Sequence, residues 1–464
     1  MYIQFLWPVL LALALLSGPT FATPTIQHWT TANGARVYFV AAHELPLVDM
    51  RLVFDAGSAR DQDLPGLARF TNLMLQEGAG PHDADTVAER LAALGAELTT
   101  DSGRDMAWVS LRVLSDPVVR DPAVELLGLI AAQPALTAEA LRRVRGQLLV
   151  KLRAEQQSPA DVASRAFYTH VFGDHPYALP PSGTEASISA IEVSDLKRFH
   201  QRYYVSQNTV VVIVGDLDRA QAELLATRAV AKLSSGEPAS ALPAAPSVEA
   251  SSERSIDFPS AQTHILVGQP AISRLHDDYY ALYVGNHVLG GGGLVSLLFE
   301  EIRARRGLAY SVGSYVIPMR AEGPYIMGLQ TQGEQAAKAV ELMRGLLKDF
   351  VKKGPTAEQL QAAKKNITGG FPLRLDSNHK ILGHVATIGF YGLPLDHLDT
   401  FSARIDAVTV EDVRSVFARH IDPQRLVTVM VGPSGGASVP SSKAREVGIP
   451  ANHGHSIPRD FIEQ

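Results

Sequence analysis

Apolar residues recur along the chain with two different periods, which predict an alternation of strands and helices. In the first half, short runs rich in β-branched and aromatic residues predict strands at 35–40, at 47–54 and, as an alternating pair, within 97–113. Apolar positions three to four residues apart predict helices at 66–77, 85–94, 121–132 and 137–155. The second half repeats this order with different loops. Strands interspersed with helices in this way indicate an α+β fold of mostly antiparallel sheets, each covered on one face by helices.

The two halves of the chain share a duplicated segment. Residues 191–215 align without a gap with residues 408–432, and the identical positions are Val193, Asp195, Arg202, Gln207, Val210, Val212, Val214 and Gly215. In each copy, an amphipathic helix is predicted to follow Ser194 or Glu411, and a turn and a β-branched strand ending in Gly come next. We therefore expect two tandem homologous units of about 200 residues each.

Composition marks the boundaries of these units. Residues 1–22 are typical of an export signal, because an apolar core is followed by small residues where cleavage is expected. The stretch 233–253 is rich in Ser, Ala and Pro and predicts a linker. The two units are then expected at 23–232 and 254–433. Residues 434–464 have a composition similar to that of the linker and predict a flexible tail.

Charge and composition exclude several classes of function. The chain has 42 Lys and Arg against 48 Asp and Glu, a net charge of −6, so no basic surplus exists to neutralise nucleic-acid phosphates. Cysteine is absent, which excludes disulfides, Cys nucleophiles and thiolate metal sites. Together with the export signal, this composition predicts a soluble periplasmic protein. An uncleaved N-terminal anchor is the alternative.

Five phrases, in order, carry a resemblance to a known enzyme family. They are FDAGSARD at 54–61, PGLARFTNLMLQEGA at 65–79, FGDHPYALPPSGT at 172–184, VVIVGD at 211–216 and LGGGGLVSLLFEEIRARRGLAYSVGSY at 289–315. Through these phrases, residues 25–435 resemble the pitrilysin/insulinase family of zinc metallopeptidases, which includes the mitochondrial processing peptidases. The resemblance implies the duplicated metallohydrolase fold of that family.

The zinc-binding positions of this family are replaced in the chain. The family's zinc helix carries H-x-x-E-H, in which the two His bind the metal and the Glu activates a water. In the matching frame, Arg69 and Leu73 stand at the His positions and Asn72 stands at the Glu position. Counting back from Pro159, Lys151 stands at the third ligand position. Two cations facing one pocket repel a dication, so we expect no metal and no peptidase activity in this chain alone.

The other half of the family's site is retained. Arg303 and Tyr310 stand seven residues apart, the spacing at which family members place an Arg and a Tyr opposite the zinc. The resemblance implies that the phenol stabilises the oxyanion and that the guanidinium holds the substrate. Alternatively, Arg303 belongs to a solvated basic helix end and Tyr310 is a core aromatic. The tract Gly290–Gly293 lacks the Lys-Ser/Thr of a phosphate loop and predicts a flexible turn beside the substrate cleft.

The leading hypothesis is a non-catalytic subunit of a periplasmic heterodimeric peptidase. In several family members, one chain carries the zinc helix, a sister chain carries the Arg/Tyr pair, and the two enclose a clam-like chamber. Here the zinc is expected in a partner subunit, and Arg303 and Tyr310 are expected to act in trans on unfolded peptides bound partly as an added strand.

Two other hypotheses stay open. One is a peptide-binding or scaffold homodimer with no hydrolytic role. The other is a hydrolase with an unrecognised metal site. For that site, His170/His175 and His379/His384 are poor ligand pairs, because a spacing of five residues takes them off one helical face.

Overall fold

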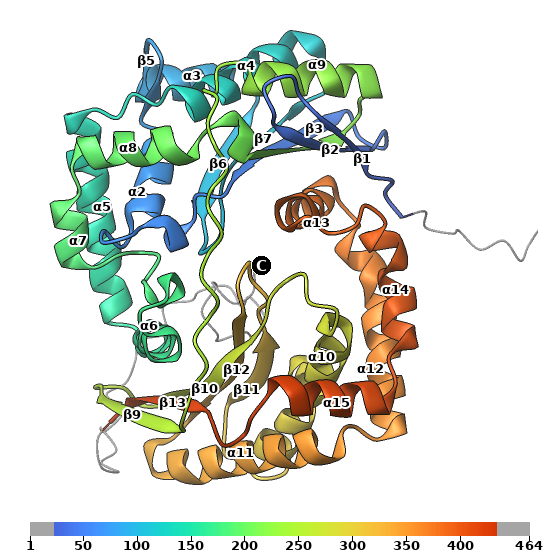
Figure 1. Ribbon diagram of the computed structural model, residues 1–464. Helices are drawn as coiled ribbons and strands as arrows, with labels where there is room; N and C mark the ends of the chain where they lie inside the picture. Colours follow the sequence, from blue (N-terminus) through green and yellow to red (C-terminus); the bar gives the residue numbers. More distant parts are fainter. Residues whose placement is uncertain (1–22, 434–464) are drawn as a thin grey trace, which may run out of the picture.

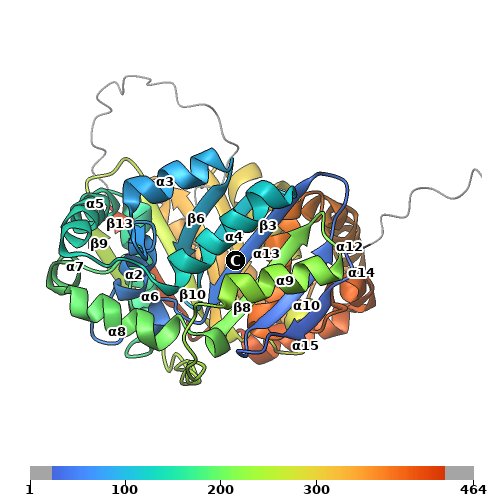
Figure 2. The same cartoon turned by 90° about the horizontal axis from the view of Figure 1, so that it is seen from above.

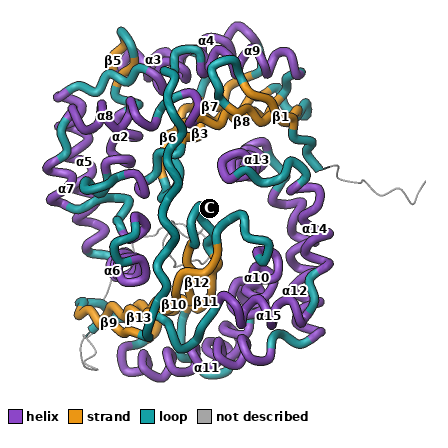
Figure 3. The backbone as a smooth tube through the Cα atoms, viewed as in Figure 1, coloured by secondary structure: helices purple, strands orange, loops and turns teal. Residues whose placement is uncertain are grey.

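The computed structural model describes residues 23–433, which form two β-sheets surrounded by helices (Figure 1). The sheets lie at opposite ends of the molecule, and helices flank both of them (Figure 3). The predicted export signal at 1–22 and the predicted tail at 434–464 lie outside the described residues. Within residues 23–433, none of the helices combines the length and the apolarity that crossing a bilayer requires.

The first sheet has six strands in the order β1-β2-β8-β3-β7-β6. Their bounds are Gln27–Thr30 for β1, Arg36–Ala41 for β2, Leu47–Phe54 for β3, Glu97–Ser102 for β6, Ala107–Leu114 for β7 and Thr209–Gly215 for β8. β2 and β8 run parallel, and the other neighbouring pairs in this sheet are antiparallel. A separate two-stranded hairpin joins β4 (Gly78–Ala79) to β5 (His82–Asp83).

The second sheet has five strands in the order β11-β12-β10-β13-β9. Their bounds are Ser252–Asp257 for β9, Thr263–Ile272 for β10, Ser311–Val316 for β11, Gly323–Thr331 for β12 and Val427–Gly432 for β13. β13 and β9 run parallel, and the other neighbouring pairs in this sheet are antiparallel.

The two sheets share one topology. Apart from β1, the first sheet has the order β2-β8-β3-β7-β6, and the second has the matching order β9-β13-β10-β12-β11. The single parallel pair occurs at the same place in each sheet. β8 and β13 are the strands of the duplicated segment and occupy equivalent positions. The prediction of an α+β fold with two homologous, mostly antiparallel units is therefore confirmed.

Helices α2 to α9 belong to the first half of the chain. Their bounds are Leu67–Met74 for α2, Ala84–Ala93 for α3, Pro117–Ala132 for α4, Ala138–Gln156 for α5, Pro159–Phe172 for α6, Glu185–Ala190 for α7, Val193–Tyr203 for α8 and Arg219–Val230 for α9. The first half also has three short 3₁₀ turns: Ser58–Arg60 before α2, Pro176–Ala178 after α6 and Ser206–Asn208 after α8.

Helices α10 to α15 belong to the second half. Their bounds are Tyr279–Asn286 for α10, Ala336–Lys353 for α11, Ala357–Gly370 for α12, Asn378–Tyr391 for α13, His397–Ala407 for α14 and Val410–His420 for α15. Shorter helical turns are π-helical at His287–Gly291 and Phe299–Ala304, and 3₁₀ at Gly293–Val295, Gly333–Gln335 and Phe371–Arg374.

The two duplicated helices begin earlier than the sequence pattern predicts. The N-cap of α8 is Glu192 and that of α15 is Thr409, so the expected starts after Ser194 and Glu411 were wrong by about one half-turn. The reason is a capping box in each copy, because the carboxylate of the N3 residue (Asp412 in α15) accepts the backbone N–H of the cap residue.

Each unit contributes one helix to the sheet of the other unit. α6 of the first half packs on β10 and β13, and α13 of the second half packs on β8, β3 and β2 (Figures 1 and 2). The close approach of α13 depends on Gly389, where a Cβ atom would come within 2.8 Å of Tyr38 and Val210. The expectation of helices on one face only was therefore wrong, since the exchanged helices bury the second face of each sheet.

A buried polar network ties the two halves together. Asp105, in the loop between β6 and β7, accepts hydrogen bonds from the hydroxyls of Tyr177 at 2.6 Å and Tyr391 at 2.8 Å. It also accepts one from the backbone N–H of Arg320 at 2.8 Å, and the Tyr177 hydroxyl accepts one from the N–H of Ala321. Residues from both halves thus share one carboxylate, which fixes the position of one unit relative to the other.

Candidate functional site

Helix α2 carries the positions that correspond to the family's zinc motif. Its N-terminus is held by Asp61, whose carboxylate accepts the backbone N–H groups of Gly66 at 2.6 Å and Ala68 at 2.7 Å. Gly66 has φ of 91°, a left-handed conformation that favours glycine at this turn. Burial raises the pKa of Asp61 well above its ordinary value, although the two backbone donors oppose this shift. The helix is thereby fixed in register with the loop that precedes it.

Asn72 faces the sheet, where it is almost fully buried, with 1% of its surface exposed. Its side-chain Nδ2 donates to the carbonyl of Trp108 at 3.2 Å and to the hydroxyl of Tyr204 at 3.3 Å. Burial raises the pKa of the Tyr204 hydroxyl, which keeps this phenol neutral. Asn72 is therefore a structural amide that joins α2 to β7 and to the end of α8.

Arg69 and Lys151 line the same cavity, which has a volume of about 380 Å³ and lies between α2, α5 and α6. Leu73 is half-buried and packs against the core of the first unit. Neither Leu73 nor Asn72 lines this cavity. Of the four positions that the sequence singles out on α2 and α5, the structure thus brings Arg69 and Lys151 together, buries Asn72 and packs the half-buried Leu73 against the core.

The cavity is more cationic than the sequence reveals. Its charged lining consists of Arg69, Arg104, Lys151, Arg165, Glu155 and Asp161. Four cations against two carboxylates leave an excess of two positive charges, which disfavours a dication. Arg104, from the β6–β7 loop, and Arg165, on α6, were missed at the sequence level. No local pattern marks them, because they reach the cavity only through tertiary packing.

Arg303 and Tyr310 are in contact on the surface of the second unit. Arg303 lies in the π-helical turn Phe299–Ala304, and its guanidinium carbon is 5.3 Å from the centre of the Tyr310 ring. This distance is typical of a cation–π pair. Tyr310 is 69% exposed, and its backbone N–H donates to the carbonyl of Gln330 at 3.1 Å. The alternative in which Tyr310 is a core aromatic does not fit this exposure.

The tract Gly290–Gly293 precedes this pair. It does not form an open loop, because it spans the end of the π-helical turn His287–Gly291 and the start of the 3₁₀ turn Gly293–Val295. The latter turn exposes Leu294 and Val295, at 71% and 77%. This turn contacts the turn that carries Arg303. Two exposed apolar side chains thus lie on a turn that adjoins the turn of Arg303, and the guanidinium of Arg303 contacts the exposed Tyr310.

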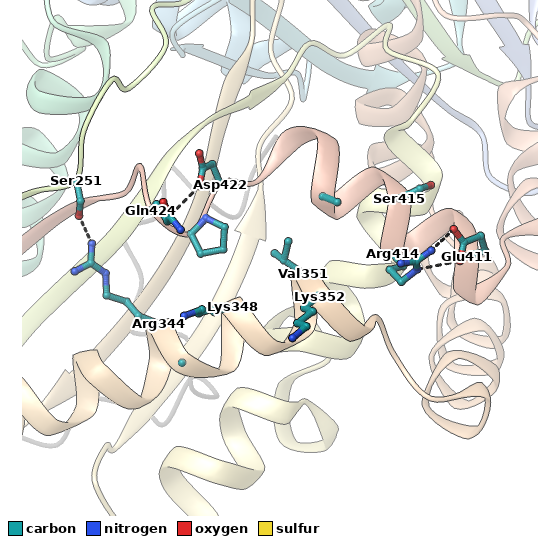
Figure 4. Close-up of a pocket in the computed structure, with 13 residues that line it drawn as sticks. Ser251, Arg344, Lys348, Val351, Lys352, Glu411, Arg414, Ser415, Asp422 and Gln424 are labelled. Atoms are coloured by element: carbon teal, nitrogen blue, oxygen red, sulfur yellow. Dashed lines mark hydrogen bonds and ion pairs between the residues drawn. The ribbon is translucent and has the colours of Figure 1, made fainter.

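A larger cavity, of about 910 Å³, lies elsewhere, between α11 and α15 (Figure 4). It contains several basic side chains, two of which have partners: Arg344 contacts Ser251, and Arg414 pairs with Glu411. None of the motif positions lines this cavity. Its size alone does not make it the reactive site, since the chemistry that the sequence predicts lies on α2 and near β11.

Among residues 23–433, three side chains are grouped closely enough to hold a metal ion: His276, Asp278 and His420. His420 Nε2 lies 2.7 Å from an Asp278 carboxylate oxygen, and Arg419 pairs with the same carboxylate. The group joins the start of α10 to the end of α15, and none of its members is on α2 or α5. It does not reproduce the zinc motif, because its two His residues lie on different segments of the chain and not on one helix.

Of the other His residues considered from the sequence, His170 and His175 have structural contacts, whereas His379 is exposed. His175 uses both ring nitrogens: one contacts the carbonyl of Pro243 at 3.0 Å and the other accepts the N–H of Tyr177 at 3.1 Å. His170 contacts the carbonyl of Ala166 and the guanidinium of Arg254. Burial, aided by nearby Arg charges, lowers the pKa of His384 to about 4.

Comparison with known protein families gives two matches that together cover most of the chain. The model described as "Insulinase (Peptidase family M16)" matches residues 36–185. The model described as "Peptidase M16 inactive domain" matches residues 190–367. The first match contains the α2 positions, and the second contains Arg303 and Tyr310.

Similar proteins are found among curated sequences and solved structures. The "Non-peptidase homolog YmxG" of Helicobacter pylori is 28% identical over 399 residues, covering 85% of this chain and 91% of the relative. A structure described as the peptidase M16 inactive domain from Pseudomonas fluorescens has 37% identity and a TM-score of 0.85, covering 88% of this chain and 98% of that chain. A protease structure from Helicobacter pylori, at 19% identity and a TM-score of 0.82, shares the fold; it covers 88% of this chain and 100% of that chain.

Proposed function

This chain belongs to the M16 (insulinase) peptidase family, and we propose that it is a non-catalytic subunit that completes the site of a zinc-bearing family member. As proposed, it lacks hydrolytic activity alone, binds no zinc at α2, and contributes Arg303 and Tyr310 in trans. The likeness to a relative named a non-peptidase homologue and to an M16 inactive domain supports an inactive role.

The observation that carries the proposal is the surface pair of Arg303 and Tyr310. A buried Tyr would have a packing role, but Tyr310 is 69% exposed and its ring contacts a guanidinium that is itself exposed. A phenol held in this way can donate a hydrogen bond to an oxyanion, and an Arg beside it can hold a carbonyl or orient the phenol. These groups suit a site whose metal is supplied by another chain.

The neighbouring turn adds a surface that fits a partner or a peptide. Leu294 and Val295 are exposed apolar side chains on a turn that contacts the turn of Arg303. Exposed apolar groups that gather beside a polar pair are typical of interaction sites. At the opposite sheet, β6 is an edge strand with the exposed residues Glu97 and Thr99, and such an edge accepts an extended peptide as an added strand.

The test is reconstitution with a zinc-bearing M16 chain from the same organism. Each chain is assayed alone and in a one-to-one mixture against an unfolded peptide substrate, and complex formation is measured by gel filtration with light scattering. We expect a heterodimer and activity only in the mixture. Export is tested separately, by cell fractionation and N-terminal sequencing of the mature protein, and the proposal places it in the periplasm with cleavage near Ala22.

Two outcomes favour the other hypotheses. A stable homodimer that binds peptides, forms no complex with the zinc-bearing chain and leaves its activity unchanged supports the scaffold alternative. Peptidase activity of the purified chain alone, abolished by a chelator and restored by zinc, supports the hydrolase with an unrecognised metal site.

A further inference from the structure

The cavity between α2, α5 and α6 contains a half-buried cationic group, Arg69, with one unsatisfied donor. The Nε atom of Arg69 is shielded from solvent and has no hydrogen-bond partner. A buried N–H without an acceptor costs free energy, so its presence in a polar cavity requires an explanation. The side chain lines a space of about 380 Å³, which lies within the range of ligand-binding pockets.

The carboxylates of the cavity do not neutralise Arg69. Glu155 accepts a hydrogen bond from Ser182 at 2.9 Å and lies 3.7 Å from Arg165. Among the ion pairs made by residues 23–433, none involves Arg69. The cavity thus keeps a cationic surplus around an Arg whose guanidinium has capacity to bind an anion.

Arg104 reinforces this surplus from a rigid position. It is 6% exposed, its guanidinium carbon lies 3.4 Å from the centre of the Tyr168 ring, and its Nε donates to the carbonyl of Tyr177 at 3.3 Å. These contacts hold a second positive charge at the cavity wall. On α5, Lys151 lines the same cavity and is exposed, so the cavity opens to solvent on that side.

We propose that this cavity, which is lined by two of the positions that match the family's zinc-site motif, binds a carboxylate of a peptide, with Arg69 as its principal ligand. The planar guanidinium suits a carboxylate because two N–H groups can donate to its two oxygens in parallel. The proposal rests on the proposed function, since it names a substrate class for the chain: peptides with an acidic side chain or a free C-terminal carboxylate. Replacement of the metal ligands has, on this view, converted a cation site into an anion site.

The experiment measures binding of N-acetylated ten-residue peptides to the purified chain (residues 23–464) by titration calorimetry. Three peptides share one neutral Ala/Ser/Gly sequence: one has a free C-terminus, one is amidated, and one is amidated with an internal Glu. We expect the amidated neutral peptide to bind more weakly than at least one of the others. Which carboxylate peptide binds better distinguishes a terminal from a side-chain source.

Variants locate the binding to the cavity. Arg69→Gln is expected to lower the affinity of the chain for the carboxylate peptides by about 10-fold to 100-fold, because hydrogen bonds to charged groups are stronger than those between neutral groups. Its affinity for the amidated neutral peptide is expected to stay unchanged. Arg153→Gln is the matched control, because Arg153 lies on α5, pairs with Glu185 and does not line the cavity. Circular dichroism confirms that each variant is folded.

Three results overturn the proposal: equal affinity for all three peptides, an equal loss in the Arg69→Gln and Arg153→Gln variants, or no binding of any peptide at millimolar concentration. None of these results bears on the proposed function, which is tested separately by peptidase activity with the zinc-bearing chain. If reconstitution fails but carboxylate binding still depends on Arg69, the proposed role in catalysis is contradicted and the peptide-binding site is supported.

Discussion

The guanidinium of Arg303 lies over the ring of Tyr310, with 5.3 Å between the guanidinium carbon and the ring centre. The same guanidinium lies 4.9 Å from the centre of the Phe299 ring, so it is placed between two aromatic side chains. The pair is held by a short turn and by the start of β11, and the Tyr310 side chain still faces solvent. This arrangement holds a phenol on the surface without using its hydroxyl, and it leads to the first prediction.

Tyr310→Phe in the reconstituted complex is expected to lower turnover by about 10²–10³-fold, because it removes one oxyanion donor and preserves the ring. Affinity for the zinc-bearing chain, measured by gel filtration or titration calorimetry, is expected to stay unchanged. Tyr315→Phe is the control, since Tyr315 lies on β11 and is half-buried. Full activity of the Tyr310→Phe complex would contradict the catalytic role and favour the scaffold alternative.

Arg303→Ala is expected to reduce both turnover and apparent substrate affinity in the same complex. The guanidinium can bind the peptide in the ground state and in the transition state, so its loss raises KM and lowers kcat. Arg305→Ala is the matched control, because Arg305 follows on the same turn and pairs with Glu300 and Glu301. Equal effects of the two changes would show that general charge, and not the stacked Arg303, matters.

The chain is expected to bind no zinc at the α2–α5 cavity, because the cationic side chains of Arg69 and Lys151 both line it and repel a dication. Metal content after gel filtration in zinc-containing buffer measures this. The measurement uses a His420→Ala variant beside the unmodified chain, because His276, Asp278 and His420 form a separate group of ligands. One tightly held zinc per chain in the His420→Ala variant would contradict the non-catalytic proposal.

Restoring the motif with Arg69→His, Asn72→Glu and Leu73→His is expected to give little zinc binding, because Lys151 still places a cation at the cavity. Adding Lys151→Glu is expected to give measurable zinc affinity by calorimetry. Adding Arg153→Glu to the three changes is the control, with the same charge change outside the cavity. Equal affinities with Lys151→Glu and Arg153→Glu would show that Lys151 is not at the ligand position.

The variants that restore the motif are also expected to be less stable than the unmodified chain, because they remove a buried amide at position 72. Asn72 donates to Trp108 and Tyr204, and an ionised Glu cannot donate in its place. We expect Asn72→Glu alone to lower the free energy of unfolding by about 1–3 kcal/mol, measured by urea denaturation. The metal measurements therefore require variants that circular dichroism shows to be folded.

Local patterns predicted the elements well, because each depends on neighbours in the sequence. The strand predicted at 47–54 is β3, with the same bounds, since its run of apolar residues is bounded by turn signals. The helix predicted at 137–155 is α5 (Ala138–Gln156), and its N-cap Thr137 can be recognised from the sequence because Thr is a favoured N-cap residue. The replacement of the zinc motif could also be recognised from local sequence, because the H-x-x-E-H frame occupies one short helix.

Features that depend on distant contacts escaped prediction. The exchange of α6 and α13 between units follows from packing of entire faces, such as Gly389 against Tyr38, which lie 351 residues apart. The inward direction of Asn72 depends on Tyr204, which no motif links to it. For the same reason, the sequence placed Arg69 and Lys151 near each other but did not reveal Arg104 in the same cavity.

The shared carboxylate predicts that the two halves unfold together. Asp105→Ala leaves the hydroxyls of Tyr177 and Tyr391 without their acceptor, and each buried unsatisfied donor costs about 1–3 kcal/mol. We expect a loss of more than about 3 kcal/mol in the free energy of unfolding and a single transition in the unmodified chain. Asp376→Ala, which removes an exposed pair with Lys380, is the control and is expected to change stability by less than about 1 kcal/mol. Two separate transitions in the unmodified chain would contradict the coupling.

Stability is expected to fall as the pH is lowered from about 6.5 to about 4, because two half-buried His residues, His384 and His397, resist protonation. Burial, reinforced by the charges of nearby Arg side chains, lowers the pKa of His384 and of His397 to about 4. In the unfolded chain these groups take up protons near their ordinary value of about 6.5, so over this window the unfolded state binds more protons and is favoured by acid. The measurement is the urea midpoint at pH 7, 6, 5 and 4.5. The double variant His384→Gln and His397→Gln should have a flatter profile than the unmodified chain. An unchanged slope in the double variant would assign the acid sensitivity to other groups.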